Sequence, residues 1–525
     1  MTSCLALPDI PLFKNACKFA ETDATAVDDV RVGKTYSYRD LVYAAAKLRQ
    51  QLLRDRCDLK GERVGVLCPS GFAYVVCQWA TWAAGGVAVP LCTSHPLAEQ
   101  QYAVEEAQVT HFIGHSVFKD RVQELVKGTD GLDIMLLEDQ DFNVEKPVIP
   151  ERFPMDMDKP ALIIFTSGTT GKPKGAVTTH STIDAQASVL VDAWRWSSSD
   201  RIHHILPLHH VHGIINALTC ALYCGATVEM HQKFDAAQVW SRWQEGYQKT
   251  APLLTLFMSV PTVYAKLIQH YKSLEPKDQQ SCSASCQQFR LMVSGSASLP
   301  TPLRETWRKI SSGQVLLERY GMTEIGMALS QGYDLGERVE GTVGMPLPGV
   351  HVRLMDESGQ NVTDSREVPG MLQIKGRNVF KEYWQRPEAT RKEFTDDGWF
   401  ITGDMAMRVS EKGYYQILGR ASIDIIKSGG EKVSALEVER ELLSCDLGIH
   451  DAAVVGIPDP EWGQRVAAVV VMDTGKKLDL VTLRNVLKAR LASYKVPTRL
   501  KTVAELPKNA MGKVTKNGLL PLFEE

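Results

Sequence analysis

A run rich in glycine, hydroxyl and lysine side chains follows a short apolar stretch, and these residue types together are suited to binding phosphate. The apolar stretch ALIIF (161–165) predicts a buried strand, and the polar run TSGTTGKPKG (166–175) begins directly after it. Glycine permits a tight turn that brings backbone N–H groups near an anion, hydroxyls add donors, and lysine adds positive charge. We therefore predict a nucleoside triphosphate site at Thr166, Ser167, Gly168, Thr169, Thr170, Gly171, Lys172 and Lys174.

Two other interpretations of this run can be tested against its residues. Pro173 follows Lys172, so no Ser or Thr comes directly after that lysine and the P-loop spacing is absent. Serine, threonine, glycine, proline and lysine are also ordinary residues of exposed loops, which is the alternative to a binding site. The run therefore favours phosphate binding by a loop of a different kind from the P-loop.

The run closely resembles the signature of the adenylate-forming superfamily, which includes acyl-CoA synthetases, firefly-type luciferases and the adenylation domains of peptide synthetases. Further segments in the same order extend this resemblance over nearly the whole chain. The resemblance implies an α/β fold, with a large N-terminal multi-sheet domain and a small mobile α+β C-terminal domain. It also implies that ATP and Mg²⁺ activate a carboxylic acid, which is then transferred to the thiol of CoA.

The segment ERYGMTE (318–324) resembles the second diagnostic motif of this superfamily. The resemblance implies that Tyr320 stacks on adenine, Thr323 contacts the α-phosphate and Glu324 binds magnesium. An aromatic face, a hydroxyl and a hard carboxylate oxygen are suited to those three partners. The segment SGSA (294–297) resembles the loop that flanks adenine. From these two segments we expect nucleotide contacts at Gly295, Ser296, Ala297, Glu318, Tyr320 and Gly321.

Further segments nearer the C-terminus also resemble binding segments of the superfamily. Asp404 matches an aspartate that accepts hydrogen bonds from both ribose hydroxyls, and Arg420 matches a second ribose contact. Lys513 matches the lysine that neutralises the α-phosphate and the substrate carboxylate during adenylation. The resemblance further implies a pantetheine tunnel at Ser428, Gly429 and Gly430, and a magnesium site at Thr169 and Glu324.

Arg319 is the main indication of which acid is bound, because most members of the superfamily have a small residue at this position. A buried arginine without an anionic partner costs about 3–5 kcal/mol. Its neighbour Glu318 should point to the opposite face of an extended segment. A second carboxylate on the substrate is a suitable bidentate partner, so we predict malonate or methylmalonate as the acid.

A histidine-rich segment, LPLHHVHG (206–213), supports the same interpretation. Together with the motif around Arg319 it resembles the malonyl-CoA synthetase branch of the superfamily, in which this segment lines the acyl pocket. A metal site is the alternative for the histidines. Arg304 is another possible carboxylate anchor, but its helix-like setting favours a surface position. The substrate-binding residues are predicted to be His210, His212, Ser294 and Arg319.

The predicted function is an AMP-forming ligase that makes malonyl-CoA from malonate, ATP and CoA through malonyl-adenylate. A ligase for short- or medium-chain monocarboxylic acids is the alternative if Arg319 pairs within the protein. A non-enzymatic nucleotide-binding regulator and a luciferase-like oxygenase are alternatives of other classes. A regulator derived from a ligase would be marked by loss of Lys513, Glu324 or Asp404, and all three are present.

The elements that must position these residues alternate between short apolar runs and segments of helical periodicity. This alternation favours α/β layers with mostly parallel sheets. Strands are predicted at 64–67, 86–91, 162–165 and 291–294, and helices at 41–54 and 72–83.

A polar segment rich in small residues (418–431) predicts a boundary between two domains. A ten-residue helix is predicted to begin at Ala435, with strands at 452–456 and 466–471. We predict an N-terminal adenylation domain (1–419), a mobile C-terminal domain (420–525) and a hinge near 420–424.

The composition excludes several classes of protein. The 525 residues exceed the size of one hydrophobic core, and 59 Lys plus Arg nearly balance 62 Asp plus Glu, which argues against a nucleic-acid-binding surface. No uninterrupted apolar stretch predicts a transmembrane segment. The eleven cysteines are expected to be free thiols in a reducing compartment. Since the N-terminal residues do not resemble a signal or transit peptide, we expect a cytoplasmic enzyme, with the mitochondrial matrix as the alternative.

Overall fold

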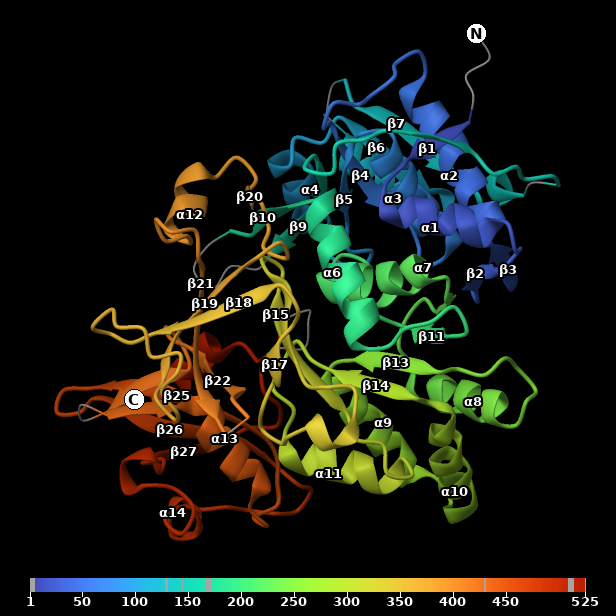
Figure 1. The fold of residues 1–525 in the computed structure, drawn as a ribbon. Coiled ribbons are helices and arrows are strands. Elements are labelled where there is room, and N and C mark those ends of the chain that lie inside the picture. The colour runs from blue at the N-terminus through green and yellow to red at the C-terminus, as the bar shows by residue number, and fades with distance from the viewer. Residues whose placement is uncertain are drawn as a thin grey trace.

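The computed structural model describes residues 5–127, 131–143, 145–166, 172–410, 412–428, 431–508 and 514–524. Figure 1 shows layers of strands covered by helices, with the N-terminal residues in blue at the top and the C-terminal residues in red at the lower left. Two large sheets make up most of the N-terminal part, and smaller sheets make up the rest. This arrangement confirms the predicted α/β class.

One sheet has seven strands over the described residues, in the order β20-β10-β9-β5-β4-β6-β7. The neighbours from β9 to β7 are parallel, whereas β10 is antiparallel to both β9 and β20. β9 reads PALIIFT and is mostly buried, as expected of a strand covered on both faces. The strands are β4 (Arg63–Leu67), β5 (Val87–Pro90), β6 (His111–His115), β7 (Asp133–Leu137), β9 (Pro160–Thr166), β10 (Lys174–Thr179) and β20 (Glu382–Tyr383).

A second sheet, counted over the same described residues, has nine strands in the order β17-β16-β15-β14-β13-β11-β12-β2-β3. The neighbours from β15 to β2 are parallel, and antiparallel strands close both edges. The strands are β2 (Thr25–Asp29), β3 (Lys34–Ser37), β11 (Arg201–His204), β12 (Thr227–Met230), β13 (Leu256–Ser259), β14 (Leu291–Ser294), β15 (Leu317–Met322), β16 (Gly326–Ser330) and β17 (Met345–Pro346).

Helix α3 (Phe72–Ala83) joins the two large sheets, because it contacts β4 and β5 of the first and β2 of the second. All of its side chains are buried, which explains why its sequence is apolar on every face. The indole N–H of Trp82 donates a 2.7 Å hydrogen bond to the carbonyl oxygen of Ala161 in β9. α2 (Tyr38–Leu53) packs beside α3 and begins with a capping box between Ser37 and Asp40.

The strands and helices predicted from the sequence are confirmed in the N-terminal part. β4, β5, β9 and β14 coincide with the predicted strands, and α2 and α3 with the predicted helices. A short parallel pair joins β1 (Ala6–Pro8) to β8 (Glu151–Phe153). The other helices are α1 (Pro11–Ala20), α4 (Leu97–Glu106), α5 (Lys119–Val126), α6 (His180–Ala193), α7 (Cys220–Cys224), α8 (Ala236–Tyr247), α9 (Pro261–Ser273), α10 (Pro276–Ser285), α11 (Thr301–Ile310) and α12 (Pro387–Lys392).

The C-terminal part contains two smaller sheets. The strands β18 (Val350–Met355), β19 (Gly370–Gly376), β21 (Phe400–Val409) and β22 (Tyr414–Arg420) form one of them. The strands β23 (Ile425–Ser428), β24 (Glu431–Ser434), β25 (Ile449–Asp459), β26 (Gly463–Met472) and β27 (Arg499–Thr502) form the other.

The last sheet carries α13 (Ala435–Ser444) and α14 (Leu480–Leu487), which share a separate hydrophobic core with it. The predicted helix from Ala435 and the two predicted strands are confirmed. β22 ends at Arg420 and β23 begins at Ile425, so one sheet gives way to the next within the predicted hinge. The division of the chain into residues 1–419 and 420–525 stays a prediction.

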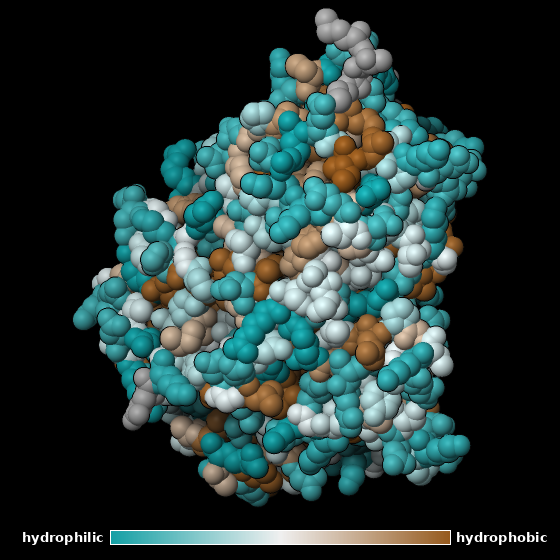
Figure 2. Space-filling view, turned by 45° about the vertical axis from the view of Figure 1, so that its right-hand side comes forward, coloured by the Kyte–Doolittle hydropathy of each residue, from teal (hydrophilic) through white to brown (hydrophobic). Residues whose placement is uncertain are grey.

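The surface seen in Figure 2 is mainly hydrophilic, with small separate hydrophobic patches. Among the described residues, no helix has both the length and the apolar character needed to cross a membrane.

Burial of uncharged histidines should make the fold sensitive to acid. His180 is 3% exposed, and its ring packs edge-on against Trp82. Burial lowers the pKa of His180 from 6.5 to about 4. Between those values the unfolded chain binds a proton that the folded chain excludes, so stability is lost as the pH falls.

We predict that His180→Gln reduces this loss of stability. From about pH 6.5 down to pH 4, His180 alone lowers the free energy of unfolding by up to about 1.4 kcal/mol per pH unit. Urea denaturation at pH 7 and pH 5 should therefore show a smaller difference for the variant than for the wild type. His450→Gln, at an exposed site, is the matched control. An equal pH dependence for His180→Gln and wild type would contradict the prediction.

Candidate active site

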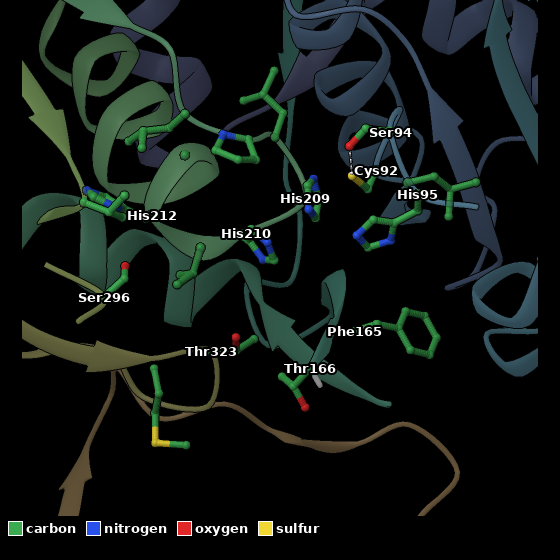
Figure 3. A pocket seen from close by; sticks show the side chains of 18 of the residues that line it. Cys92, Ser94, His95, Phe165, Thr166, His209, His210, His212, Ser296 and Thr323 are labelled. Carbon is green, nitrogen blue, oxygen red and sulfur yellow. Dashed lines mark hydrogen bonds between the residues drawn. The ribbon is translucent and has the colours of Figure 1, made fainter. Parts of the chain in front are cut away.

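A cavity of about 1210 Å³ lies where the two large sheets and the sheet of β22 meet. Its walls come from the ends of β9 and β10, the 205–213 segment after β11, the end of β15 and Arg420 of β22. Because parallel strands end at the same edge, the loops after β5, β9, β11 and β13 converge here. Figure 3 shows side chains that line the cavity, among them Cys92 after β5, Thr166 of β9, His210 after β11 and Thr323 after β15.

The phosphate-binding run is only partly within the described structure. Thr166, Lys172 and Lys174 line the cavity, whereas Ser167, Gly168, Thr169, Thr170 and Gly171 lie outside the described residues. The ammonium group of Lys174 lies 3.9 Å from the centre of the Tyr383 ring and 3.4 Å from Glu393. Two lysines thus bring positive charge to this wall, as an anionic ligand requires.

The turn from β15 to β16 delivers Gly321, Thr323 and Glu324 to the cavity. A register shift between Tyr320 and Gly321 interrupts the pairing of the two strands. Glu324 is 5% exposed, and its carboxylate accepts a 2.8 Å hydrogen bond from the Tyr383 hydroxyl. Burial raises the pKa of Glu324. A buried carboxylate at a cavity wall fits a hard cation such as Mg²⁺, which would favour its charged form.

Tyr320, Asp404 and Arg420 form a hydrogen-bonded group beside the cavity. The Tyr320 hydroxyl donates to Asp404, and Nε of Arg420 lies 3.0 Å from the other carboxylate oxygen of Asp404. Asp404 and Arg420 face each other on the antiparallel strands β21 and β22. Arg420 lines the cavity, whereas Tyr320 and Asp404 are not among its lining residues. The fold therefore brings the three predicted nucleoside contacts together, with Arg420 nearest the cavity.

Arg319 lines the cavity and is 4% exposed. One guanidinium nitrogen donates a 3.1 Å hydrogen bond to Ser296 Oγ, whereas Nε has no hydrogen-bond partner among the described residues. Over the same residues, no carboxylate forms an ion pair with Arg319. Burial lowers its pKa to about 9. The cavity therefore contains a desolvated cation suited to an anionic ligand.

Glu318 faces away from Arg319, as predicted for neighbours in a strand. Its carboxyl group is influenced by Arg304 and Arg440, and burial raises its pKa to about 7. It is not among the cavity-lining residues, so the structure does not bring this predicted nucleotide contact to the site. The prediction of a surface position for Arg304 is wrong. That side chain is buried and donates a 2.6 Å hydrogen bond to the Arg338 carbonyl oxygen, because its face of α11 packs inward.

Gly295 allows Arg319 to occupy this position. A Cβ at residue 295 would lie 2.4 Å from Nε of Arg319 and 2.5 Å from its Cζ, closer than van der Waals contact permits. The guanidinium therefore lies against the backbone of Gly295 while it donates to Ser296. Of the predicted 294–297 segment, only Ser296 lines the cavity. Ser294, Gly295 and Ala297 are not among the lining residues, so the structure does not bring these three predicted contacts to the cavity.

His210 and His212 line the cavity, as predicted for the histidine-rich segment. His212 is buried and begins a π-helix (His212–Thr219), a local structure frequent at functional sites. Burial lowers the pKa of His212 well below its usual value, and nearby Arg319 lowers it further. The imidazole next to Arg319 is therefore neutral. It contributes no charge of its own, and the positive charge of the guanidinium stays uncompensated. Gly213 allows the two ends of the 207–213 segment to approach each other closely, since a Cβ there would lie 2.2 Å from the Pro207 carbonyl oxygen.

Several cavity residues were missed by the sequence analysis. Cys92, His95 and His209 lie on one wall (Figure 3), and Tyr383 and Glu393 on another. The sequence offered one indication of the first wall. Cys92 closely follows β5, and residues at the carboxyl end of a parallel strand often line a binding site. The Tyr383 wall had no comparable signal, because β20 joins the sheet from more than 200 residues away from β10.

Of the three residues predicted to contact CoA, the structure describes Ser428 alone. Ser428 is buried at the end of β23 and does not line the cavity. Gly429, Gly430 and Lys513 lie outside the described residues. Their roles therefore stay predictions.

Comparisons with known proteins show similarity over nearly the whole chain. A family model described as AMP-binding enzyme matches residues 13–384, and one described as AMP-binding enzyme C-terminal domain matches residues 437–513. A Mus musculus protein named malonate–CoA ligase ACSF3, mitochondrial, is 44% identical over 539 residues, covering 97% of this chain and 90% of the relative. An Arabidopsis thaliana malonate–CoA ligase is 38% identical, covering 98% of this chain and 89% of the relative.

A solved structure agrees over almost the whole chain. ATP-bound MatB from Rhodopseudomonas palustris superposes with a TM-score of 0.85 at 33% identity, covering 98% of this chain and 99% of that one. This similarity confirms the predicted fold, with its large N-terminal and small C-terminal domains.

We predict that Gly295→Ala displaces the Arg319 guanidinium from Ser296. The new methyl group overlaps the guanidinium, and such overpacking typically costs about 1–3 kcal/mol of stability. Urea denaturation measures this cost, and a crystal structure of the variant shows the displacement. Gly336→Ala is the matched control, because a Cβ there would meet no atom within 4 Å. A variant with unchanged stability and Arg319 still bonded to Ser296 would disprove this role of Gly295.

Proposed function

The chain belongs to the AMP-binding enzyme family, and on that premise we propose that it is an AMP-forming malonate–CoA ligase. A carboxylate oxygen of malonate attacks the α-phosphorus of ATP, and pyrophosphate leaves. The thiol of CoA then loses its proton and attacks the carbonyl carbon of malonyl-adenylate, which releases AMP. The names of the mouse and Arabidopsis relatives support malonate as the acid.

The observation that carries this proposal is the buried cation of Arg319 at the cavity wall. A guanidinium with one neutral hydrogen-bond partner has donors left for a second carboxylate. Malonate supplies that carboxylate close to the one that reacts, and a bidentate pair would offset the cost of burying the charge. A monocarboxylic acid would leave Arg319 without such a partner. This difference favours malonate over acetate or a medium-chain fatty acid.

We assign the binding of the phosphates, the nucleoside and the metal ion to other predicted site residues. Lys172 and Lys174 supply positive charge for the phosphates of ATP, and Thr323 donates to the α-phosphate. The group of Tyr320, Asp404 and Arg420 holds the nucleoside. Glu324 and Thr169 would hold Mg²⁺, which would supply charge neutralisation for the pyrophosphate.

We assign the remaining predicted roles to the C-terminal domain. Lys513 completes the site in the first step, and Ser428, Gly429 and Gly430 border the path of CoA in the second. Both roles require residues 420–525 to move relative to residues 1–419. The change of sheet between Arg420 and Ile425 supports a hinge at this place.

We further propose the mitochondrial matrix as the location of the protein, in preference to the cytoplasm. The mouse relative is named a mitochondrial protein, and it is covered over 90% of its length. Imaging of a C-terminal fluorescent fusion with a mitochondrial marker tests this location, and a diffuse cytoplasmic signal would contradict it.

The proposed function predicts malonate as the preferred acid. Pyrophosphate release should be measured with malonate, methylmalonate, succinate, acetate and octanoate, each with and without CoA. We expect the highest kcat/KM with malonate, and steady turnover only when CoA is present to release AMP. A preference for octanoate or acetate would keep the ligase reaction but contradict the role of Arg319. AMP formation that does not depend on CoA would contradict the ligase itself.

Arg319→Gly should reduce malonate turnover selectively. Loss of hydrogen bonds to a charged group costs about 1.5–3 kcal/mol, which corresponds to a decrease in kcat/KM of about 10- to 150-fold. Turnover of acetate by the same variant is the internal control, because acetate has no second carboxylate. Arg319→Lys should lose less, since it keeps the charge without the planar fork. An unchanged malonate kcat/KM in Arg319→Gly would remove the specificity argument.

A further inference from the structure

Cys92, His95 and His209 form a cluster of potential metal ligands on the cavity wall. One ligand atom from each residue, a sulfur and two imidazole nitrogens, lies within 4.8 Å of the other two. Figure 3 shows His209 between the Cys92 and His95 pair and His210. None of these three residues has a role in the reaction proposed above. We refer to them as the Cys-His-His cluster.

Two members of the cluster come from one tight turn after β5. The backbone N–H of His95 lies 3.3 Å from the carbonyl oxygen of Cys92, which closes the turn. Buried Gln100 of α4 donates a 2.6 Å hydrogen bond to the Cys92 carbonyl oxygen. Arg121 of α5 lies 3.4 Å from the His95 carbonyl oxygen and 3.1 Å from the Gln100 side-chain oxygen. The surrounding helices therefore hold the turn in place.

The third member, His209, approaches from the segment after β11. The hydroxyl of Tyr74 on α3 donates a 2.8 Å hydrogen bond to the carbonyl oxygen of Leu208. The His95 and His209 rings meet edge to face, with centroids 5.2 Å apart. Both backbone segments that carry the cluster are thus fixed by hydrogen bonds from helices. A metal ion would therefore have to order the three side chains but not the backbone, which reduces the entropy cost of binding.

The donor atoms favour a borderline-soft cation over Mg²⁺ or Ca²⁺. Cysteine sulfur and imidazole nitrogen are the usual ligands of Zn²⁺, whereas Mg²⁺ and Ca²⁺ require oxygen. In a tetrahedral zinc site the ligand atoms are about 3.3–3.6 Å apart, so ligand atoms that are up to 4.8 Å apart must move closer together by up to about 1.5 Å. A carboxylate oxygen of Glu99 lies 3.2 Å from Nδ1 of His95. Such a carboxylate orients a histidine and leaves Nε2 for the metal.

We propose that Cys92, His95 and His209 bind Zn²⁺, with the fourth coordination position facing the substrate cavity. The site is separate from the magnesium site assigned to Glu324, because its ligands differ in chemistry and come from other segments. Bound Zn²⁺ joins the 92–95 turn to the segment that carries His210 and His212, and it occupies part of the cavity. Zn²⁺ at this site therefore inhibits the enzyme reversibly.

Direct binding tests the site without reference to the ligase reaction. Chelator-treated full-length protein is titrated with Zn²⁺ in a calorimeter, without substrate, and with Co²⁺ as a spectroscopic probe. We expect about one equivalent of Zn²⁺ to bind at this site and the Co²⁺ complex to show thiolate-to-metal charge-transfer absorption. Cys92→Ser and His209→Gln should each weaken Zn²⁺ binding more than about tenfold, and Glu99→Gln by about tenfold.

Matched controls separate this site from other cysteines and from misfolding. Cys57 is exposed and outside the cavity, so Cys57→Ser should bind Zn²⁺ and Co²⁺ as the wild type does. Thermal unfolding midpoints show whether each variant is folded. Cys92→Ser is almost isosteric, and His209→Gln provides an independent test if that variant alone is unstable.

The outcomes of these experiments distinguish a failure of the proposed metal site from a failure of the proposed ligase function. Zn²⁺ binding that is equal in Cys92→Ser, His209→Gln and wild type, or no saturable binding to wild type, would overturn the proposal. With the acid that the wild type uses best, Zn²⁺ should inhibit pyrophosphate release, a chelator should restore it, and Cys92→Ser should resist inhibition. Inhibition that is equal in Cys92→Ser and wild type would disprove the regulatory role. A failure of malonate turnover would leave the binding result unaffected.

Discussion

The positive charge of Arg319 is desolvated at the cavity wall, and neighbouring residues are arranged so that it stays available. Gly295 gives it space, Ser296 accepts one hydrogen bond, and His212 is held neutral by burial. The nearest carboxylate in the sequence, Glu318, points to the opposite face of β15. Neutralisation of this cation within the protein would remove the reason to prefer a dicarboxylic acid. The specificity of the proposed reaction thus depends on leaving one buried charge incompletely satisfied.

The rest of the cavity extends this electrostatic arrangement. Lys172 and Lys174 place cations where the phosphates are proposed to bind, and Lys174 is held by Tyr383 and Glu393. Glu324 adds a carboxylate to the same cavity, where we propose that it would hold Mg²⁺. In the proposed function, different parts of one cavity are therefore assigned to different ligand groups, namely Arg319 to malonate, the lysines to the phosphates and Arg420 to the nucleoside. The Cys-His-His cluster adds a wall of softer donors, where a cation of another type fits.

Much of the fold was accessible from the sequence because local patterns are strong where strands are buried on both faces. The stretch 161–165 is apolar throughout, and it lies in β9 near the centre of a mainly parallel sheet. Helix α3 was predicted at its observed bounds. Arg304 was placed incorrectly because a helical pattern gives the faces of a helix but not the partner that covers each of them. The partner of Arg304 is the carbonyl oxygen of Arg338, which belongs to a distant loop.

The sequence by itself determined the chemistry of the site. The phosphate-binding run, the segment 318–324 and the histidine-rich segment together pointed to adenylation, and Arg319 pointed to a dicarboxylic acid. Such inferences are possible because residue type sets charge and hydrogen-bonding capacity wherever a side chain lies. Only the tertiary structure decided which of these side chains share a cavity. It turned Glu318 away from Arg319, placed Tyr383 beside Glu324, and brought His209 to the turn of Cys92 and His95. These contacts join segments far apart in the chain, and their distances follow from how sheets and helices pack, which no local pattern of residues encodes.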